Sequence, residues 1–326
     1  MGIVISCSLN IMYQGVCLAM RILVTGGGGF IGRFLVSDLV KKGYDVIVVD
    51  RGPSPFIEHQ RIKYHVGDVT NVIQMNNIMA KYKPEVVIHL AALLADTCEV
   101  EPLQATKVNI EATQNLIELS ITHGIKRFVF MSSASVYHPD TPEPVREEDA
   151  GKPVSYYGVT KYAGELIGSW YYRKGLIDFR ALRPTVVFGP GRFRGPSAEY
   201  SSMIIERALN NEKVIVKNPN DKVNYIYVRD AVSALILLAE AEKVKYRAYN
   251  AAGFVSRVIE FVEMVKKYIP ALQYEVQQLE AVRYAAVIDD SKIREELGWR
   301  PQYTYEKAIE DYIETVRKGE ELFRVY

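Results

Sequence analysis

The stretch Arg21-Ile-Leu-Val-Thr-Gly-Gly-Gly-Gly-Phe-Ile-Gly32 decides the fold of this chain. Residues 22–24 predict a short buried strand, and the glycines after it satisfy the spacing Gly26-x-x-Gly29-x-x-Gly32. A turn this tight needs residues without a Cβ, and it lets a pyrophosphate approach the backbone N–H groups at the start of a helix. The stretch therefore predicts a strand, a phosphate-binding turn and a helix, in that order.

An acidic residue, Asp50, ends the next predicted strand, about twenty residues after the turn. At that position a carboxylate accepts hydrogen bonds from both hydroxyls of an adenosine ribose and repels a 2′-phosphate. Arg51 is a competing signal, because a guanidinium beside the ribose pairs with a 2′-phosphate. We therefore expect NAD as the cofactor, with NADP as the alternative.

The rest of the chain alternates short β-branched runs with longer amphipathic segments, which is typical of βαβ units around a parallel sheet. The predicted strands are 22–24, 46–49, 86–90, 128–131 and 179–182, and the predicted helices are 30–42, 72–82, 103–123 and 156–174. After residue 183 the pattern weakens, with predicted helices at 199–210, 230–241, 257–268 and 305–319 and strands at 214–216 and 225–228. The fold class is thus α/β, a Rossmann-type doubly wound parallel sheet over 21–183, with 184–326 mainly a smaller C-terminal substrate-binding lobe.

Residues 1–20 are interpreted as an N-terminal extension. The stretch is apolar, but Asn10 and Gln14 interrupt it and it lacks the basic start of a signal peptide. Met20 immediately precedes the first predicted strand, so a start at Met20 would suffice. We expect no membrane association from this stretch.

Composition excludes several classes of partner. Lys plus Arg total 40 against 39 Asp plus Glu among 326 residues, so a formal net charge of +1 gives no general attraction to nucleic acid or anionic membranes. The cysteines Cys7, Cys17 and Cys98 are odd in number and lack Cys-x-x-Cys spacing, and the five histidines are scattered. These patterns predict no disulfide framework and no metal site, and they favour the cytoplasm.

The segment Tyr157-Gly-Val-Thr-Lys161 places a phenol and an ammonium group one helical turn apart on the same face. A nearby Lys⁺ and a nicotinamide cation both favour phenolate, so we expect the Tyr157 pKa to fall well below its ordinary value near 10. Ser133 follows the predicted strand 128–131. Because ligands bind off the carboxyl ends of strands in open parallel sheets, we expect both segments to meet the cofactor there.

These motifs together resemble the extended short-chain dehydrogenase/reductase superfamily, the NAD-dependent epimerase/dehydratase group, from about residue 21 onward. The resemblance rests on TGGGGFIG at 25–32, Asp68-Val69, His89-Leu-Ala-Ala92, Asn109, SSASVY at 132–137, the Tyr-x-x-x-Lys pair and Leu182-Arg-Pro184. It implies that Ser133 orients the substrate, that Tyr157 is the acid/base and that Lys161 holds the nicotinamide ribose.

The same resemblance implies which residues surround the cofactor. Asp68 and Val69 would border the adenine, Ala91 and Ala92 would line the cleft, and Asn109 looks like the buried helix Asn of the family. The full set of implied cofactor-binding residues is Gly26, Gly29, Phe30, Ile31, Gly32, Asp50, Arg51, Asp68, Val69, Leu90, Ala91, Ala92, Asn109, Tyr157, Lys161 and Pro184.

The sequence indicates the substrate less narrowly than it indicates the cofactor. Sugar-nucleotide members usually hold the substrate diphosphate with an Asn and an Arg, and the matching positions here are Val186 and Val223. An apolar side chain donates nothing to a phosphate oxygen, so the charge would have to come from elsewhere. The candidates for it are Arg192, Arg194, Lys217, Lys222 and Arg283.

We expect hydride transfer at a secondary alcohol of a sugar or sugar nucleotide, as in UDP-glucose 4-epimerase. Segments 195–200, 249–253 and 288–291, with Gly298-Trp299, are instead similar to short-chain L-threonine dehydrogenases. The alternative is therefore an NAD-dependent dehydrogenase of a small hydroxy acid or hydroxy amino acid. A non-catalytic NAD sensor is disfavoured because it would not need Ser133, Tyr157 and Lys161 together.

The expected partners are a small-molecule substrate and a second copy of the chain. The predicted dimer interface is formed by the helices 103–123 and 156–174. The aromatic stretch Trp170-Tyr-Tyr172 lies on the second helix, whose other face must carry Tyr157 to the cofactor. A helix-pair dimer is also common in the family.

Overall fold

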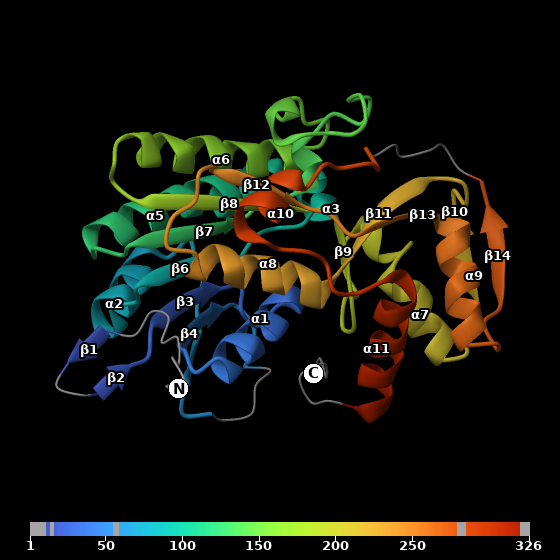
Figure 1. Ribbon diagram of the computed structural model, residues 1–326, viewed down its shortest axis with the longest axis horizontal. Helices are drawn as coiled ribbons and strands as arrows, with labels where there is room; N and C mark the ends of the chain where they lie inside the picture. Colours follow the sequence, from blue (N-terminus) through green and yellow to red (C-terminus); the bar gives the residue numbers. More distant parts are fainter. Residues whose placement is uncertain (1–10, 14–15, 55–58, 279–284, 320–326) are drawn as a thin grey trace, which may run out of the picture.

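A seven-stranded sheet forms the centre of the computed structural model, which describes residues 11–13, 16–54, 59–278 and 285–319 (Figure 1). All neighbouring strands are parallel. From one edge to the other the strands are β12 (Ala248–Ala251), β8 (Asp178–Pro184), β7 (Arg127–Met131), β6 (Val86–His89), β3 (Arg21–Thr25), β4 (Asp45–Asp50) and β5 (Ile62–Val66). This order confirms the predicted doubly wound α/β fold.

Helices cover both faces of the sheet, which is why its central strands are largely buried and mostly apolar. One face carries α2 (Val72–Tyr82), α3 (Ala95–Val100), α4 (Pro102–Ala105), α5 (Ala112–Thr122) and α6 (Tyr156–Arg173). The other carries α1 (Phe30–Lys41) and α8 (Val228–Glu240). Figure 1 shows α5 and α6 above the sheet and α1 and α8 below it.

The predicted helix 103–123 is wrong in one respect. A π-helical segment, Thr106–Glu111, separates α4 from α5. Asn109 lies within it, and its buried side chain bonds to the backbone of Leu93 in a neighbouring loop. A wider helical turn of this kind is frequent at functional sites, and apolar periodicity does not predict it.

The C-terminal part forms a second layer beside the sheet. Its strands are β9 (Val186–Phe188), β11 (Lys222–Tyr227) and β13 (Phe254–Arg257) in one small sheet, with β10 (Val214–Lys217) and β14 (Tyr274–Gln277) paired in another. Its helices are α7 (Ser202–Leu209), α9 (Val258–Tyr268), α10 (Ser291–Leu297) and α11 (Tyr305–Lys318). Because α8 and β12 join the central sheet, the chain after residue 183 contributes to both layers.

A hairpin precedes the first strand of the central sheet. It consists of β1 (Ile11–Tyr13) and β2 (Val16–Leu18), which pair antiparallel within the region interpreted as an extension. Residues 1–10, including Cys7 and Asn10, lie outside the described residues, as does Gln14. Met20, immediately after the hairpin, is buried in the main core.

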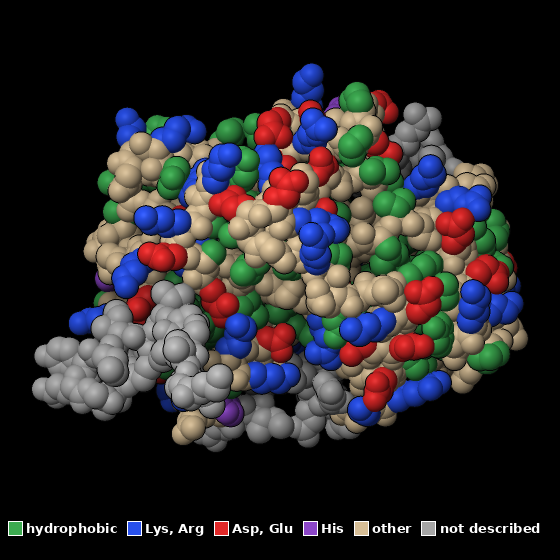
Figure 2. Space-filling view, in the orientation of Figure 1, with side chains coloured by type: hydrophobic (Ala, Val, Ile, Leu, Met, Phe, Trp, Pro, Cys, Tyr) green, Lys and Arg blue, Asp and Glu red, His purple; other side chains and the backbone are tan. Residues whose placement is uncertain are grey.

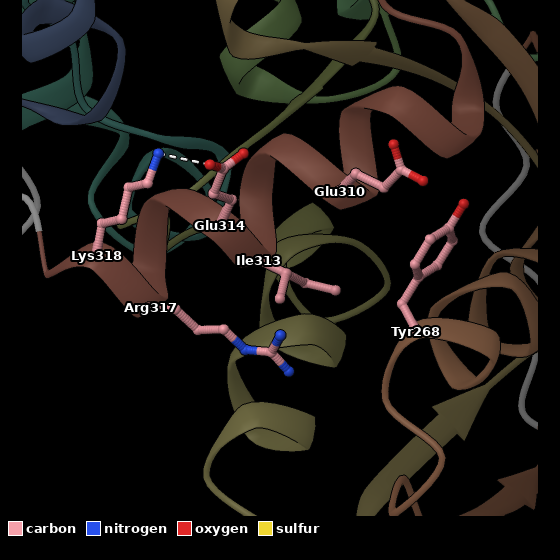
Figure 3. Close-up of a pocket in the computed structure, with 6 residues that line it drawn as sticks. All are labelled: Tyr268, Glu310, Ile313, Glu314, Arg317 and Lys318. Atoms are coloured by element: carbon pink, nitrogen blue, oxygen red, sulfur yellow. Dashed lines mark ion pairs between the residues drawn. The ribbon is translucent and has the colours of Figure 1, made fainter.

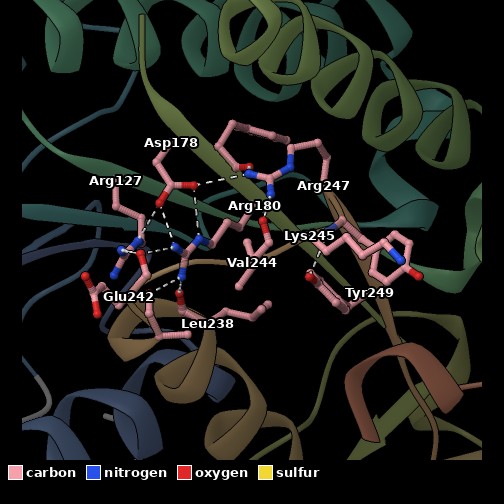
Figure 4. A network of polar contacts seen from close by, with 12 residues as sticks. Arg127, Asp178, Arg180, Leu238, Glu242, Val244, Lys245, Arg247 and Tyr249 are labelled. Carbon is pink, nitrogen blue, oxygen red and sulfur yellow. Dashed lines mark hydrogen bonds and ion pairs between the residues drawn. The ribbon is translucent and has the colours of Figure 1, made fainter. Parts of the chain in front are cut away.

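Three arginines fix the amino-terminal edge of the sheet (Figure 4). Arg127, Arg180 and Arg247 all contact the carboxylate of Asp178. The guanidinium of Arg180 also donates to the carbonyl oxygen of Leu238, near the end of α8, at 2.6 Å. Cations at a helix C-terminus stabilise its unpaired carbonyls, so this cluster joins α8 to the strands at the edge away from the predicted site.

Charges of both signs are interspersed on the face shown in Figure 2, and neither sign forms a continuous patch there. Within the described residues, no helix is long and apolar enough to cross a membrane.

Candidate active site

The glycine turn lies where the chain order of the sheet reverses. Strand β3 pairs with β4 on one side and with β6 on the other, and ligands bind off the carboxyl ends of strands at such a point. Gly26 has φ +70°, and a Cβ added there would lie 2.7 Å from the backbone nitrogen of Ala91. A Cβ on Gly32 would lie 2.3 Å from the carbonyl oxygen of Gly26. Both positions therefore need glycine.

The turn leaves helix α1 open to an anion. Its N-cap, Gly29, supplies no side-chain cap, so the first N–H groups of the helix are unpaired by any side chain. Phe30 and Ile31 form the first turn and are partly buried. The residues present therefore fit a dinucleotide pyrophosphate.

Asp50 is held beside this turn. Its carboxylate accepts hydrogen bonds from the N–H of Gly28 at 3.0 Å and from the N–H of Gly52 at 3.1 Å. Tyr64 donates its hydroxyl to the carbonyl of Gly52 at 2.9 Å, which braces the same segment. Arg51 is exposed. The carboxylate thus lies near the turn, where the sequence predicts a ribose contact.

The other residues implied at the cofactor lie on the loops that follow β5, β6 and β8. Asp68 accepts hydrogen bonds from the N–H and the hydroxyl of Thr70, at 2.8 and 2.7 Å, and so shapes the loop into α2. Val69 and Pro184 are buried. Leu90, Ala91 and Ala92 are partly buried in the loop after β6, which Gly26 touches.

Asn109 is a buried support of that loop. Its Oδ1 accepts from the N–H of Leu93 at 2.8 Å, while its Nδ2 donates to the Leu93 carbonyl at 3.1 Å and to Thr160 Oγ1 at 3.0 Å. Through these bonds Asn109 joins the loop after β6 to helix α6, one turn from Tyr157.

Ser133, Tyr157 and Lys161 come together at the carboxyl end of β7. Lys161 is 2% exposed and donates from Nζ to the carbonyl of Met131, the last residue of β7, at 2.8 Å. Its Nζ lies 5.6 Å from the ring centroid of Tyr157. Ser133 follows β7; its hydroxyl donates to Ser135 Oγ at 3.0 Å and helps to lower the pKa of Tyr157. Strand β7 and helix α6 therefore bring the three residues to one place, as the sequence predicts.

Without the cofactor, burial raises the pKa of Tyr157 to about 12, while the charge of Arg192 and the hydroxyl of Ser133 act in the opposite direction. The expected lowering includes the charge of the nicotinamide cation, so it stays a prediction for the NAD complex. Burial also lowers the pKa of Lys161 to about 8. Removing both groups from water favours their neutral forms, and this effect outweighs the attraction expected between them.

Tyr156, the neighbouring tyrosine, points elsewhere. Its hydroxyl pairs with Thr106 Oγ1 at 2.6 Å, and its N–H donates to Glu99 at 2.6 Å. Tyr156 therefore connects α6 to α3 and the π-helical segment, which leaves Tyr157 as the phenol beside Ser133.

A family model for the NAD dependent epimerase/dehydratase family matches residues 22–252, well over half of the chain. The chain belongs to this family. Its cofactor is NAD, and it is an enzyme. The match spans the central sheet with both of its helical layers, together with the glycine turn and the Ser133, Tyr157 and Lys161 group.

Relatives in this family divide between two activities. The chain is 29% identical to the L-threonine 3-dehydrogenase, mitochondrial, of Sus scrofa, over 89% of this chain and 80% of that protein. It is also 29% identical to a putative UDP-glucose 4-epimerase of Methanocaldococcus jannaschii, over 91% of this chain and 99% of that protein. The crystal structure of a UDP-glucose 4-epimerase of Thermotoga maritima with UDP-glucose is 29% identical and superposes with a TM-score of 0.83, over 92% of this chain and 99% of that one.

In this epimerase/dehydratase fold, a buried polar network lies next to Ser133 and Lys161, and the sequence analysis did not predict it. The carboxylate of Glu165 accepts from Arg183 Nε at 2.8 Å and from Ser132, the neighbour of Ser133. Arg183 also donates to the Tyr137 hydroxyl at 2.8 Å. One signal was present: Glu165 follows Lys161 by one helical turn, so both lie on the same face of α6.

The structure separates the cations considered for the substrate. Arg194, Lys217 and Lys222 are exposed, and Arg283 lies outside the described residues. Arg192 is the partly buried member, in the loop after β9. Val223 is buried in the core, so this family member has no cation there for a diphosphate.

A surface hollow lies away from this site, between α9 and α11 (Figure 3). It is lined by Tyr268, Glu310, Ile313, Glu314, Arg317 and Lys318. None of the sequence motifs contributes to it. Within the described residues, no three His, Cys, Asp or Glu side chains are grouped to hold a metal ion.

Proposed function

We propose that this chain catalyses hydride transfer at a secondary alcohol of a sugar or sugar nucleotide. The observation that carries the proposal is the position of buried Lys161, fixed by the Met131 carbonyl and 5.6 Å from the Tyr157 ring, after the strand that Ser133 follows and at the sheet edge that holds the glycine turn. NAD, when bound, accepts the hydride from the carbinol carbon. The chain must then hold the substrate oxygen and take its proton.

Each catalytic residue has a separate task in this proposal. Tyr157 takes the proton from the substrate hydroxyl as general base, and returns it as general acid in the reverse direction. Ser133 holds the same oxygen by a hydrogen bond. Lys161, fixed by the Met131 carbonyl, places positive charge near the phenolate that forms and holds the nicotinamide ribose.

The proposed cofactor contacts follow the geometry of the loops. The glycine turn at Gly26, Gly29 and Gly32 takes the pyrophosphate, and Asp50 takes the adenosine ribose. The remaining proposed contacts are Phe30, Ile31, Arg51, Asp68, Val69, Leu90, Ala91, Ala92 and Pro184. Asn109 acts on the cofactor through the loop that it supports.

The domain organisation that we propose is a NAD-binding domain over 21–183 and a mainly substrate-binding part over 184–326. Helix α8 and strand β12 return from the second part to complete the sheet of the first. In this organisation the loop after β9 belongs to the substrate-binding part and lies toward the proposed catalytic residues.

The second candidate is a dehydrogenase of a small hydroxy acid or hydroxy amino acid. Buried Val223 favours it, because a sugar nucleotide diphosphate would find no donor at this position. The 29% identity to a mitochondrial L-threonine 3-dehydrogenase also supports it.

A single assay distinguishes the two functions. The protein is mixed with NAD and, separately, with UDP-glucose, UDP-galactose, uronates, aldonates and L-threonine, while absorbance of reduced nicotinamide and the isomer composition are followed. A new sugar isomer without net reduction supports the epimerase; net reduction with a hydroxy acid supports the dehydrogenase. If none of these substrates reacts while NAD binds, the proposed substrate classes are wrong.

We also propose a homodimer formed through α6 and the helices before it. Leu166 and Trp170 are 52% and 48% exposed one turn apart on α6, and Leu103 of α4 is 87% exposed. Apolar side chains gathered in this way are typical of an interaction surface. We expect Leu166→Glu to shift light scattering from dimer to monomer, whereas Ile73→Glu, at an exposed position of α2, leaves the dimer intact. A wild-type monomer at working concentration would contradict the proposal.

The cytoplasm is the compartment that we propose. Cys98 is a buried free thiol, and an odd count of cysteines favours a reducing environment.

A further inference from the structure

Arg192 is held at the side of the active site that the C-terminal part forms. Its Nη1 donates to the carbonyl of Val187, in β9, and its Nη2 donates to Ser197 Oγ at 2.6 Å. A Cβ added to Gly195 would lie 4.0 Å from Arg192 Nη2 and 3.4 Å from a methyl carbon of Leu94. Leu94 belongs to the loop after β6, so the guanidinium lies between that loop and β9.

The charge of Arg192 acts on the catalytic tyrosine. It lowers the pKa of Tyr157, and the Tyr157 phenol in turn raises the pKa of Arg192 against the opposing effect of burial. The two partly buried groups are therefore within electrostatic reach of each other.

The local fold does not need this positive charge. A guanidinium has five N–H donors, and the hydrogen bonds to Val187 and Ser197 use two of them. Among the described residues no Asp or Glu forms an ion pair with Arg192, whereas the buried Arg183 pairs with Glu165. A partly buried cation without a counter-ion loses part of its hydration, and a bound anion compensates that loss.

We propose that Arg192 binds a carboxylate of the substrate whose secondary alcohol Tyr157 deprotonates. This inference rests on the proposed function and narrows its substrate class. Planar guanidinium and carboxylate groups form paired hydrogen bonds, and Arg192 lies between β9 and the loop after β6, on the side of the sheet where the substrate would bind. Sugar acids, sugar nucleotides with a carboxylated sugar and hydroxy amino acids all meet this description.

The test compares substrates that differ in the carboxylate alone. The pairs are UDP-glucuronate with UDP-glucose, galacturonate with galactose, and L-threonine with L-threoninol, each measured for kcat/KM and for Kd with the NAD complex. We expect the best carboxylate to exceed its neutral partner at least about 100-fold in kcat/KM, since a charge-assisted pair in a partly buried site is strong.

Substitutions in the loop after β9 test whether Arg192 causes the preference for the carboxylate substrate. We expect Arg192→Gln, which keeps two donors for Val187 and Ser197, to lower kcat/KM for the carboxylate about 100-fold or more and to remove the preference. Arg192→Lys should retain part of it, because Lys keeps the charge but loses the planar pairing. Arg194→Gln, at an exposed position of the same loop, should match wild type. The Kd for NAD should stay the same in all three.

The outcomes separate this inference from the proposed function. Hydride transfer that favours the neutral members, or an equal loss on both members in Arg192→Gln, overturns the carboxylate site and leaves the proposed function standing. Hydride transfer that Tyr157→Phe fails to reduce overturns the proposed function instead. If no compound is turned over, the Kd of the carboxylate compounds decides. A Kd that is the same in wild type and in Arg192→Gln overturns the carboxylate site.

Discussion

At the residue scale, the proposed catalytic group consists of partly or fully buried polar side chains. Lys161 is 2% exposed, and burial lowers its pKa to about 8. Tyr157 shows the opposite shift, to about 12, for the same reason. Both shifts make the charged forms less favourable than they are in water, yet a Lys161 pKa of about 8 keeps its ammonium group protonated at pH 7. The tyrosine becomes an effective base only when further positive charge is placed near it.

The Tyr157 titration tests this reasoning directly. A raised pKa means that the neutral phenol is favoured, so a ¹³C-tyrosine signal assigned with Tyr157→Phe should remain that of the phenol until about pH 12. Oxidised NAD adds a positive charge, and we expect it to move the transition to lower pH. Reduced NAD, which lacks that charge on its nicotinamide, is the control. A transition that NAD leaves unmoved would contradict the prediction.

The Asp50 carboxylate should determine cofactor choice. We expect Asp50→Asn to weaken NAD binding by about 1.5–3 kcal/mol, because a charge-assisted hydrogen bond to the ribose is lost. NADP should lose less, since the variant no longer repels its 2′-phosphate. Fluorescence titration with each cofactor measures both effects. The control is Asp45→Asn, at the opposite end of β4, which should bind NAD and NADP as wild type does. A similar loss of NAD binding in this control would contradict a specific role of Asp50 in cofactor choice.

At the scale of elements, the sequence pattern predicted those helices and strands whose bounds are determined by neighbouring residues in the chain. Helix α2 begins at Val72 and ends at Tyr82 as predicted, and the strand, turn and helix around Gly26 appear in order. The π-helical segment around Asn109 was not predictable, because the Leu93 backbone that Asn109 binds comes from another loop. Strands β12, β13 and β14 were missed for a related reason. Each is short, and each gains its partner from a distant segment.

Helix α6 should tolerate no side chain at Gly168. A Cβ there would lie 2.1 Å from the ring of Phe179 in β8, closer than any contact that packing permits. We expect Gly168→Ala to destabilise the protein by roughly 1–3 kcal/mol despite the better helix propensity of Ala, because overpacking outweighs it. Guanidinium denaturation measures the change. Ser169→Ala, one position along the helix, should lie within about 0.5 kcal/mol of wild type; equal effects at both positions would contradict the packing argument.

At the scale of the whole molecule, one buried network connects the catalytic group to the C-terminal part. Glu165 of α6 pairs with Arg183 of β8, and Arg183 reaches the Tyr137 hydroxyl. Tyr137 donates to Asn250 of β12 at 2.6 Å. Sequence motifs identified Tyr157 and Lys161, but these connections join residues far apart in the chain, and spacing alone did not predict them.

Removing one charge of the buried Glu165–Arg183 ion pair should lower the stability of the protein. We expect Glu165→Gln to destabilise the protein by about 3–5 kcal/mol, because it leaves the buried charge of Arg183 without its counter-ion. The double variant Glu165→Met with Arg183→Met should recover most of that loss, since no buried charge remains. Denaturant unfolding of the variants measures the change. A double variant less stable than Glu165→Gln would contradict this account of the pair.

The most direct test of the central claim compares wild type with Tyr157→Phe on the substrate that the screen identifies. The Phe ring keeps the packing but cannot accept the proton, so single-turnover hydride transfer should fall by about 10²–10⁴-fold. The NAD Kd should change less than about twofold, because the glycine turn and Asp50 are untouched. Full hydride transfer by Tyr157→Phe would contradict the assignment of Tyr157 and, with it, the proposed mechanism.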